Sequence, residues 1–151
     1  MQEQALAEFL AAGVAGVAAT RDERLRPTIA RAWAPVLLDE DTRLRICLEA
    51  APGSPARANL ESNGTIAATF TLPSSYRSAQ VKGSVLELRQ PTSDELAAVD
   101  EHVASFSREA EAVGLMPDSG RRLIGPELVT AVIEIRELYD QTPGASAGAR
   151  L

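Results

Sequence analysis

Three residues within one short stretch of the chain, Gln80, Lys82 and Gly83, have the types and spacing of a ligand-binding ledge. In the sequence AQVKGSVLEL, which covers residues 79–88, apolar and polar residues alternate in the manner typical of a half-buried strand. An amide, an ammonium group and a bare stretch of backbone so close together favour a flat polar ligand held near the main chain. An ordinary solvated strand face is the alternative, since Lys and Gln are common there.

Three arginines, Arg31, Arg57 and Arg77, lie on segments that we expect to be neighbours. A dianionic phosphate needs several charge-assisted donors, and arginine is the strongest common choice. Ser54 precedes Pro55 at the start of an expected short helix, whose first backbone N–H groups are further donors. The alternative is that these arginines are surface ion-pair partners in an acidic protein, where each contributes little to stability.

Two aromatic side chains accompany these cations. Trp33 follows Arg31 by two residues in an expected strand, so both side chains point to the same face. Tyr76 precedes Arg77 in the polar loop LPSSYRS. Either ring can stack on an aromatic ligand, although packing in a core is the commoner use of such rings.

The single histidine and the single cysteine predict neither a metal site nor a disulfide. His102 has no second histidine to complete a zinc site, and we expect it at a solvated position of a helix. Cys47 lies in the apolar run LRICLEA, which favours a buried strand thiol. The sequence also lacks a nucleophile–base–orienter set, a cysteine-rich metal spacing and a glycine-rich phosphate loop.

The composition is that of one soluble globular domain. The chain has 151 residues, of which 45% are hydrophobic and 24% are charged, and its net charge is −6. This acidic balance argues against nucleic-acid binding, and no apolar run approaches the ~20 residues that span a bilayer. The N-terminus lacks the basic and apolar regions of a secretory signal. We therefore expect a cytoplasmic protein with a single domain over residues 1–138 and an irregular tail over 139–151.

Hydrophobic periodicity and turn residues predict a mainly β chain. Strands joined by short hairpins favour an antiparallel sheet, and six such strands can close into a barrel without exposed edges. A helix over 93–113 begins with a capping box and carries one apolar stripe, which packs on the sheet or on a partner subunit. The predicted strands cover 14–20, 28–38, 44–48, 65–72, 79–88 and 128–138, two further helices cover 2–12 and 55–62, and a polar connection covers 114–126.

Three stretches of the chain, taken in order, are similar to one known family. They are the hairpin ATRDERLRPTIARAW, the segment SPARANLESNGTIAATFTLPSSYRSAQVKGSV, which ends in a Gln-x-Lys/Arg-x-Gly-like strand, and the last strand running into YDQTPGASAG. Together they resemble the pyridoxamine 5'-phosphate oxidase-like family of flavin-binding split β-barrels. This resemblance implies a six-stranded antiparallel split β-barrel of the FMN-binding type, and a homodimer with FMN at the subunit interface.

The resemblance also implies cofactor-binding residues at matching positions. Gln80, Lys82 and Gly83 match the family strand whose Gln and backbone bind the edge of the isoalloxazine. Ser54 matches the serine that opens the short helix, and Asn59 matches the polar position before its leucine.

On the phosphate side the resemblance is less complete. Arg31 lies on the strand that usually supplies a phosphate or ribityl contact. Many family members have Lys within the short helix, where this chain has Ala56, with Arg57 one place later. Because one residue turns a helix by about 100°, either Arg57 swings back to the phosphate or that contact is missing.

The function that the resemblance implies is that of an FMN-dependent oxidoreductase, which passes a hydride or electrons to a small organic substrate. The lack of a catalytic triad agrees with this, because a flavin carries the chemistry itself. Three alternatives remain: the deazaflavin F420 in the same barrel, heme, and a cofactor-free dimeric binding module, which Ala56 favours. The Gly-rich tail after Tyr139 is expected to close over the ligand of the partner subunit.

Overall fold

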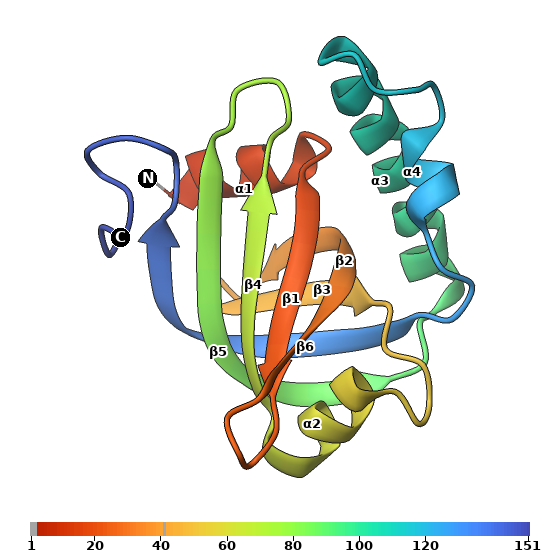
Figure 1. Cartoon of the computed structure of the whole chain (residues 1–151), viewed down its shortest axis with the longest axis vertical. Coiled ribbons are helices and arrows are strands. Elements are labelled where there is room, and N and C mark those ends of the chain that lie inside the picture. The colour runs from red at the N-terminus through yellow and green to blue at the C-terminus, as the bar shows by residue number, and fades with distance from the viewer. Residues whose placement is uncertain (1–2, 41) are drawn as a thin grey trace.

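Six antiparallel strands close into a barrel in the computed structural model, which describes residues 3–40 and 42–151 (Figure 1). Around the barrel the strands follow the order β1-β2-β3-β6-β5-β4, and β4 pairs back onto β1. This confirms the predicted mainly β fold with a closed antiparallel barrel. The strands are β1 (Ala15–Arg21), β2 (Pro27–Leu38), β3 (Arg43–Leu48), β4 (Thr65–Thr71), β5 (Ser78–Arg89) and β6 (Val129–Asp140).

The interior of the barrel is filled by side chains that alternate along the strands. In β4 the side chains of Ile66, Ala68 and Phe70 point inward and are at most 2% exposed, as the alternation in the sequence predicted. Leu44, Ile46, Val81 and Ile133 from β3, β5 and β6 complete the centre of this core.

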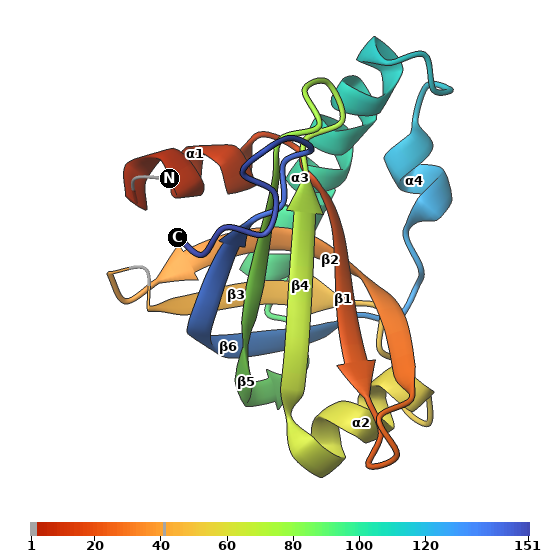
Figure 2. The ribbon, with the colours of Figure 1, turned by 60° about the vertical axis from the view of Figure 1, so that its left-hand side comes forward.

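In the described part of the chain, four helices lie around the barrel (Figures 1 and 2). Both predicted helix-start signals are confirmed, because Ser54 caps α2 and the Thr92–Glu95 capping box opens α3. α4 lies within the stretch 114–126, where the sequence predicted only a polar connection. The helices are α1 (Glu3–Ala11), α2 (Pro55–Asn63), α3 (Ser93–Ala112) and α4 (Ser119–Leu123).

The long helix α3 packs against the outside of β2 and β3. Val99, Val103, Phe106 and Ala110 are buried there against Trp33 and Cys47. The two ends of the predicted apolar stripe, Leu96 and Val113, are each 45% exposed. The stripe therefore packs on the sheet through its middle part, which is one of the two alternatives that the sequence left open.

A bulge in β2 shapes this contact. The register between β2 and β3 shifts between Trp33 and Val36, and Ala34 has a φ of 48° in the left-handed region. Arg31 and Trp33 lie on the same outer face, as predicted, but Arg31 is exposed whereas α3 covers Trp33.

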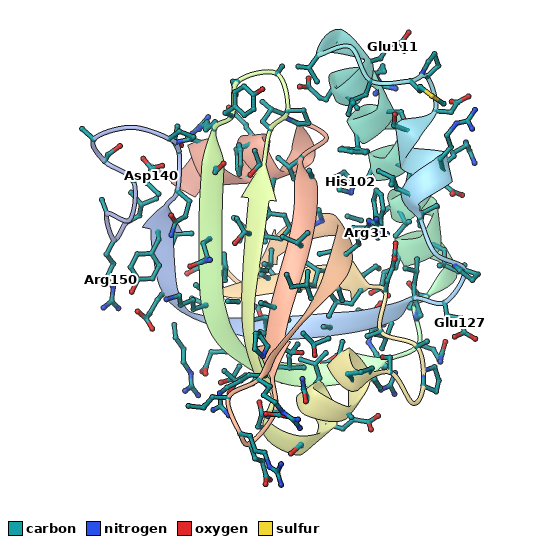
Figure 3. The ribbon with its side chains drawn as sticks, viewed as in Figure 1. Arg31, His102, Glu111, Glu127, Asp140 and Arg150 are labelled. Carbon is teal, nitrogen blue, oxygen red and sulfur yellow. The ribbon has the colours of Figure 1, made fainter. Side chains whose placement is uncertain are left out.

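The last strand is longer than the sequence predicted. β6 continues through Tyr139 and Asp140, and Tyr139 forms a β-bridge with Arg150 near the end of the tail. The carboxylate of Asp140 accepts a hydrogen bond from the amide of Thr142 at 2.8 Å, so the tail folds back beside its own strand (Figure 3).

Candidate ligand-binding site

The outward-facing side chains of β2, β1, β4, β5 and β6 form a continuous surface, which we call the outer face. Cross-strand pairing arranges them in two adjacent rows, because directly opposed residues share a face. The first row holds Ile29, Ala19, Ala67, Lys82 and Glu137, and the second holds Arg31, Val17, Thr69, Gln80 and Tyr139.

Arg31, Gln80 and Lys82 are thus brought to one face of the barrel, as the prediction of a shared ligand site requires. Arg31 and Gln80 lie in the same row, three strands apart, which corresponds to roughly 14 Å across a sheet. The amide of Gln80 donates a hydrogen bond to the hydroxyl of Thr69 at 3.0 Å, which orients its side chain along the row.

A pocket of about 410 Å³ opens on the outer face between β1, β4, β5 and β6. Its volume falls in the range of about 300–1,000 Å³ that is usual for small-molecule sites. Ala19 and Ala67 provide apolar surface, and Lys82, Gly83 and Arg21 lie on its border. Two of the predicted ledge residues, Lys82 and Gly83, therefore line this pocket.

Two charged residues at this pocket, Lys82 and Glu137, both contact the side chain of Tyr139. The ammonium group of Lys82 lies 4.8 Å from the centre of the Tyr139 ring, a cation–π contact. The phenol of Tyr139 donates a hydrogen bond to Glu137, and this bond is the main cause that holds the pKa of the Glu137 carboxyl below its usual range. Partial burial opposes that shift, while the charges of Arg150 and Lys82 add to it.

Gly83 allows a close approach of two backbones at the edge of the pocket. The β5–β6 register shifts between Lys82 and Gly83, and a Cβ at Gly83 would lie 1.9 Å from the carbonyl oxygen of Glu134. Any side chain here would collide with the neighbouring strand. The strand bulge thus explains the glycine, while its role as a cofactor-binding residue stays a prediction.

Arg31 lies in a second hollow, which the carboxylate of Glu49 shares. The Glu49 carboxylate accepts hydrogen bonds from the Trp33 indole at 2.8 Å and from the Gly125 amide at 2.9 Å. Arg31 forms an ion pair with it at 3.7 Å and donates to the carbonyl of Leu123 at 3.2 Å. Figure 3 shows Arg31 on the side of the barrel next to α4. A fixed negative charge therefore already accompanies this guanidinium group.

The short helix α2 uses its predicted site residues internally. Ala56 is 4% exposed and packs into the barrel core, so the position of the family lysine points inward. Arg57 forms an ion pair with Glu61 at 2.5 Å. Arg57 therefore pairs within its own helix, and its contact with a phosphate stays a prediction.

Ser54 and Asn59 have structural contacts as well. The hydroxyl of Ser54 accepts a hydrogen bond from the Arg57 amide at 3.2 Å, which caps α2. The buried amide of Asn59 donates to the hydroxyl of Thr20 at 3.1 Å and ties α2 to β1.

The three predicted arginines are not brought together. The guanidinium group of Arg77 lies 5.2 Å from the centre of the Phe9 ring, in the β4–β5 hairpin beside α1. Figures 1 and 2 place this hairpin at the opposite end of the barrel from α2, which carries Arg57. The prediction that all three arginines lie on neighbouring segments is therefore wrong for Arg77, whereas α2 with Arg57 does contact β2 with Arg31.

Trp33 is also removed from the pocket. It is 4% exposed, and its ring makes edge-on contacts with His102 and Phe106, each with centroids 6.0 Å apart. Tyr76, in contrast, is 66% exposed at the hairpin tip. Neither ring lines the pocket of the outer face.

His102 is buried, which corrects the expectation of a solvated helix position. Its Nδ1 accepts a hydrogen bond from the Ala34 amide, so the proton lies on Nε2 and is donated to the carbonyl of Val14 at 3.0 Å. Burial lowers the pKa of this imidazole, and its bond to Val14 opposes the shift. With both nitrogens occupied by backbone groups, His102 cannot serve as an axial heme ligand in this arrangement. In the sequence, His102 follows Val99 by three residues and precedes Phe106 by four, which is the spacing of one buried helix face.

Cys47 is a buried strand thiol, as predicted. It is 2% exposed, burial raises the pKa of its thiol, and its Sγ lies 3.8 Å from the hydroxyl of Thr130. Within residues 3–40 and 42–151, no group of three or more His, Cys, Asp or Glu side chains is placed to hold a metal ion. No described helix combines the length and the apolar character that a membrane span requires.

Two cations at the pocket, Arg21 and Arg136, were not among the predicted site residues. Arg21 continues the outward alternation of Val17 and Ala19 along β1, which was a signal in the sequence. The position of Arg136 depends on how β6 pairs with β5, which local sequence patterns do not reveal.

No protein-family model and no curated protein match this chain. Among solved structures it is similar to HupZ of Group A Streptococcus, with 18% identity, 98% of this chain and 100% of the other covered, and a TM-score of 0.57. It is similar to an F420 reductase, with 17% identity, coverage of 87% and 93%, and a TM-score of 0.57. It is also similar to an FMN-binding protein from Syntrophomonas wolfei, with 14% identity, coverage of 90% and 86%, and a TM-score of 0.53.

Identities this low show the fold alone. The chain has the split β-barrel fold that its resemblance to the pyridoxamine 5'-phosphate oxidase-like proteins implied.

Proposed function

We propose that this protein is a flavin-dependent oxidoreductase that works as a homodimer, with FMN or the deazaflavin F420 bound on the outer face of the barrel. Two structures that share its fold carry the names F420 reductase and FMN-binding protein. The observation that carries the proposal is the outer face itself, where Gln80, Lys82 and the bare backbone of Gly83 adjoin a pocket of about 410 Å³.

The residues at the pocket suit the polar and charged parts of a flavin. Lys82 and Arg21 supply positive charge for a phosphate, and Gln80 supplies an amide for hydrogen bonds to a heterocycle. Gly83 lets the backbones of β5 and β6 approach closely at the border of the pocket. A bound flavin would supply the transfer of a hydride or of electrons, while these residues would bind and orient it.

A second subunit would complete the site by covering its apolar part. Ile29 is 70% exposed and Val17 is 45% exposed on the outer face, next to the hollow of Arg31. Burial of such side chains favours association at roughly 25 cal/mol per Å² of apolar surface. A two-fold dimer through this face would also exclude water from a ligand held there.

The test is a visible absorption spectrum of the purified protein, followed by a spectrum of the supernatant after denaturation. We expect a released flavin, or a bound flavin spectrum after FMN or F420 is added. The variant Lys82→Gln should retain less of it, whereas Arg108→Gln, on the exposed side of α3, should retain as much as the wild type. A protein that stays colourless with both cofactors would contradict the proposal.

A cofactor-free dimeric binding module is the second candidate. It is favoured by the inward-pointing Ala56, by the ion pair of Arg57 with Glu61 at 2.5 Å and by that of Arg31 with Glu49 at 3.7 Å. These contacts occupy the cations that the family resemblance assigned to phosphate. The same spectra separate the two candidates.

A further inference from the structure

Positive charge collects at the pocket of the outer face, although the protein as a whole is acidic. The chain has 21 acidic and 15 basic residues. At the pocket the proportion is reversed, since Arg21, Lys82 and Arg136 line it together with a single acid, Glu137. A local reversal of charge at a concave surface is the electrostatic pattern of an anion site.

Among the described residues, two of these three cations form no ion pair within 4.0 Å of a carboxylate, although the charge of Lys82 does act on Glu137. The Lys82 ammonium contacts the Tyr139 ring at 4.8 Å, and the Arg21 guanidinium donates to the carbonyl of Asp22 at 3.3 Å. Arg136 contacts Glu134 at 3.3 Å, but its side chain is 63% exposed, so this ion pair holds it weakly. All three groups therefore retain donors for a bound anion.

The surroundings of the pocket add to this capacity. Thr65 and Ser84, which are directly opposed on β4 and β5, both line it and bring two hydroxyl groups. Its apolar part, formed by Ala19 and Ala67, reduces the contact of these donors with water. Charge–charge attraction is stronger beside a surface of low polarity than in bulk solvent.

The arginine that sequence reasoning placed at the phosphate has the opposite surroundings. The carboxylate beside Arg31 is held in place by the Trp33 indole at 2.8 Å and by the Gly125 amide at 2.9 Å. A phosphate at Arg31 would therefore face a fixed negative charge.

We propose that the pocket bordered by Arg21, Lys82 and Arg136 is a phosphate-binding subsite, and that Arg31 and Arg57 do not bind phosphate. Resting on the proposed function, the phosphate is that of the bound flavin, which places the charged end of the cofactor between β1 and β5. The hollow beside Arg31 and Glu49 then receives an uncharged part of the ligand.

The experiment is an equilibrium titration with three probes: FMN, riboflavin, which lacks only the phosphate, and inorganic phosphate. Flavin binding is followed by fluorescence quenching and phosphate binding by calorimetry. The variants are Lys82→Gln, Arg21→Gln and Arg31→Gln, with Arg108→Gln as a surface control. Circular dichroism spectra and melting temperatures establish that each variant is folded.

We expect the wild type to bind FMN more tightly than riboflavin and to bind inorganic phosphate. Lys82→Gln and Arg21→Gln should each weaken FMN and phosphate binding by about tenfold to a hundredfold, the usual loss for a hydrogen bond to a charged group. Riboflavin binding should stay within about twofold, as should all binding by Arg108→Gln, and Arg31→Gln should keep the wild-type preference for FMN over riboflavin. Loss of the FMN preference in Arg31→Gln, with Lys82→Gln unchanged, would overturn the proposal.

The probes also separate this proposal from the proposed function. If no flavin binds but phosphate binding depends on Lys82 and Arg21, the subsite stands and the flavin function fails. If FMN and riboflavin bind equally while phosphate binding still depends on Lys82, the anion subsite stands, but its assignment to the phosphate of the flavin is refuted. If the wild type does not bind inorganic phosphate and does not prefer FMN, the subsite is refuted, even where riboflavin binds.

Discussion

The backbone amide of Ala34 donates a hydrogen bond of 2.6 Å to Nδ1 of His102. Ala34 has a φ of 48°, in a region that residues other than glycine rarely adopt, so its conformation needs support from its surroundings. The same imidazole donates from Nε2 to the carbonyl of Val14 at 3.0 Å. One neutral side chain on α3 thus links the bulge of β2 to the residue that precedes β1.

This linkage predicts a stability that depends on pH. Because the pKa of His102 is lowered by burial in the folded protein, the unfolded chain binds the proton more readily. Stability should be fully present above the ordinary histidine pKa of about 6.5 and should fall as pH decreases through that value. Melting temperatures between pH 8 and pH 5.5 measure this.

The control for this prediction is His102→Gln, which cannot titrate in the same range. We expect it to be less stable than the wild type at pH 8, with a smaller decrease toward pH 5.5. An unchanged decrease in the variant would assign the effect to another group.

Glu95 should be the most important carboxylate for stability. It is 4% exposed, accepts bonds of 2.8 and 2.9 Å from Arg89 and accepts a bond of 2.7 Å from Thr130. The Arg89 bonds are the main cause that lowers its pKa to about 2, against burial. Its contribution is therefore present above pH 4.5 and lost as pH falls toward 2.

The substitution Glu95→Gln should cost on the order of 3 kcal/mol in unfolding free energy at pH 7, since it leaves a buried network without its charge. Urea denaturation measures the loss. Glu87→Gln is the matched control, because Glu87 contacts the same arginine at 3.4 Å from an exposed position, and it should cost less than about 1 kcal/mol. Equal losses in the two variants would contradict this account.

Gly83→Ala should destabilise the barrel by several kcal/mol or prevent folding, because its Cβ would lie 1.9 Å from a carbonyl oxygen of β6. The adjacent Ser84→Ala removes a hydroxyl without adding an atom near the backbone, and should melt within a few degrees of the wild type. Thermal denaturation compares the two variants. A stable Gly83→Ala protein would show that β5 and β6 can separate at this point.

Ile29→Glu should convert the expected homodimer into a monomer, since it places a charge at an exposed apolar position of the outer face. Leu25→Glu makes the same change at a residue that is also 70% exposed but lies in the β1–β2 turn, and it should leave the dimer intact. Sedimentation velocity gives the two masses. A wild type that sediments as a monomer at micromolar concentration would refute the expected dimer.

Local patterns in the sequence were sufficient for the strands and helix starts. The alternation of Ile66, Ala68 and Phe70 predicted their common inward face, and Thr92 with Glu95 predicted the start of α3. These signals are carried by neighbouring residues, so they do not depend on how the chain closes. The pairing of the neighbouring strands β2, β1, β4 and β5 brings Arg31, Gln80 and Lys82 to one face of the barrel.

Contacts between distant segments account for what the sequence did not show. Whether Arg31 is available to a ligand depends on Glu49, and this contact requires the pairing of two strands. The burial of His102 depends on a bulge in β2, 68 residues away along the chain. The short α4 is held through Ser107 of α3, whose hydroxyl accepts from the Gly120 amide at 3.0 Å.

Closure of the barrel has a consequence for synthesis on the ribosome. β6 pairs with β3 on one side and with β5 on the other, so two rows of backbone hydrogen-bonding groups stay open until residues 129–140 have left the exit tunnel. Contacts this distant in sequence slow folding and leave the nascent chain open to aggregation. A chaperone that shields strand edges would be most useful to this protein in the interval before its last strand emerges.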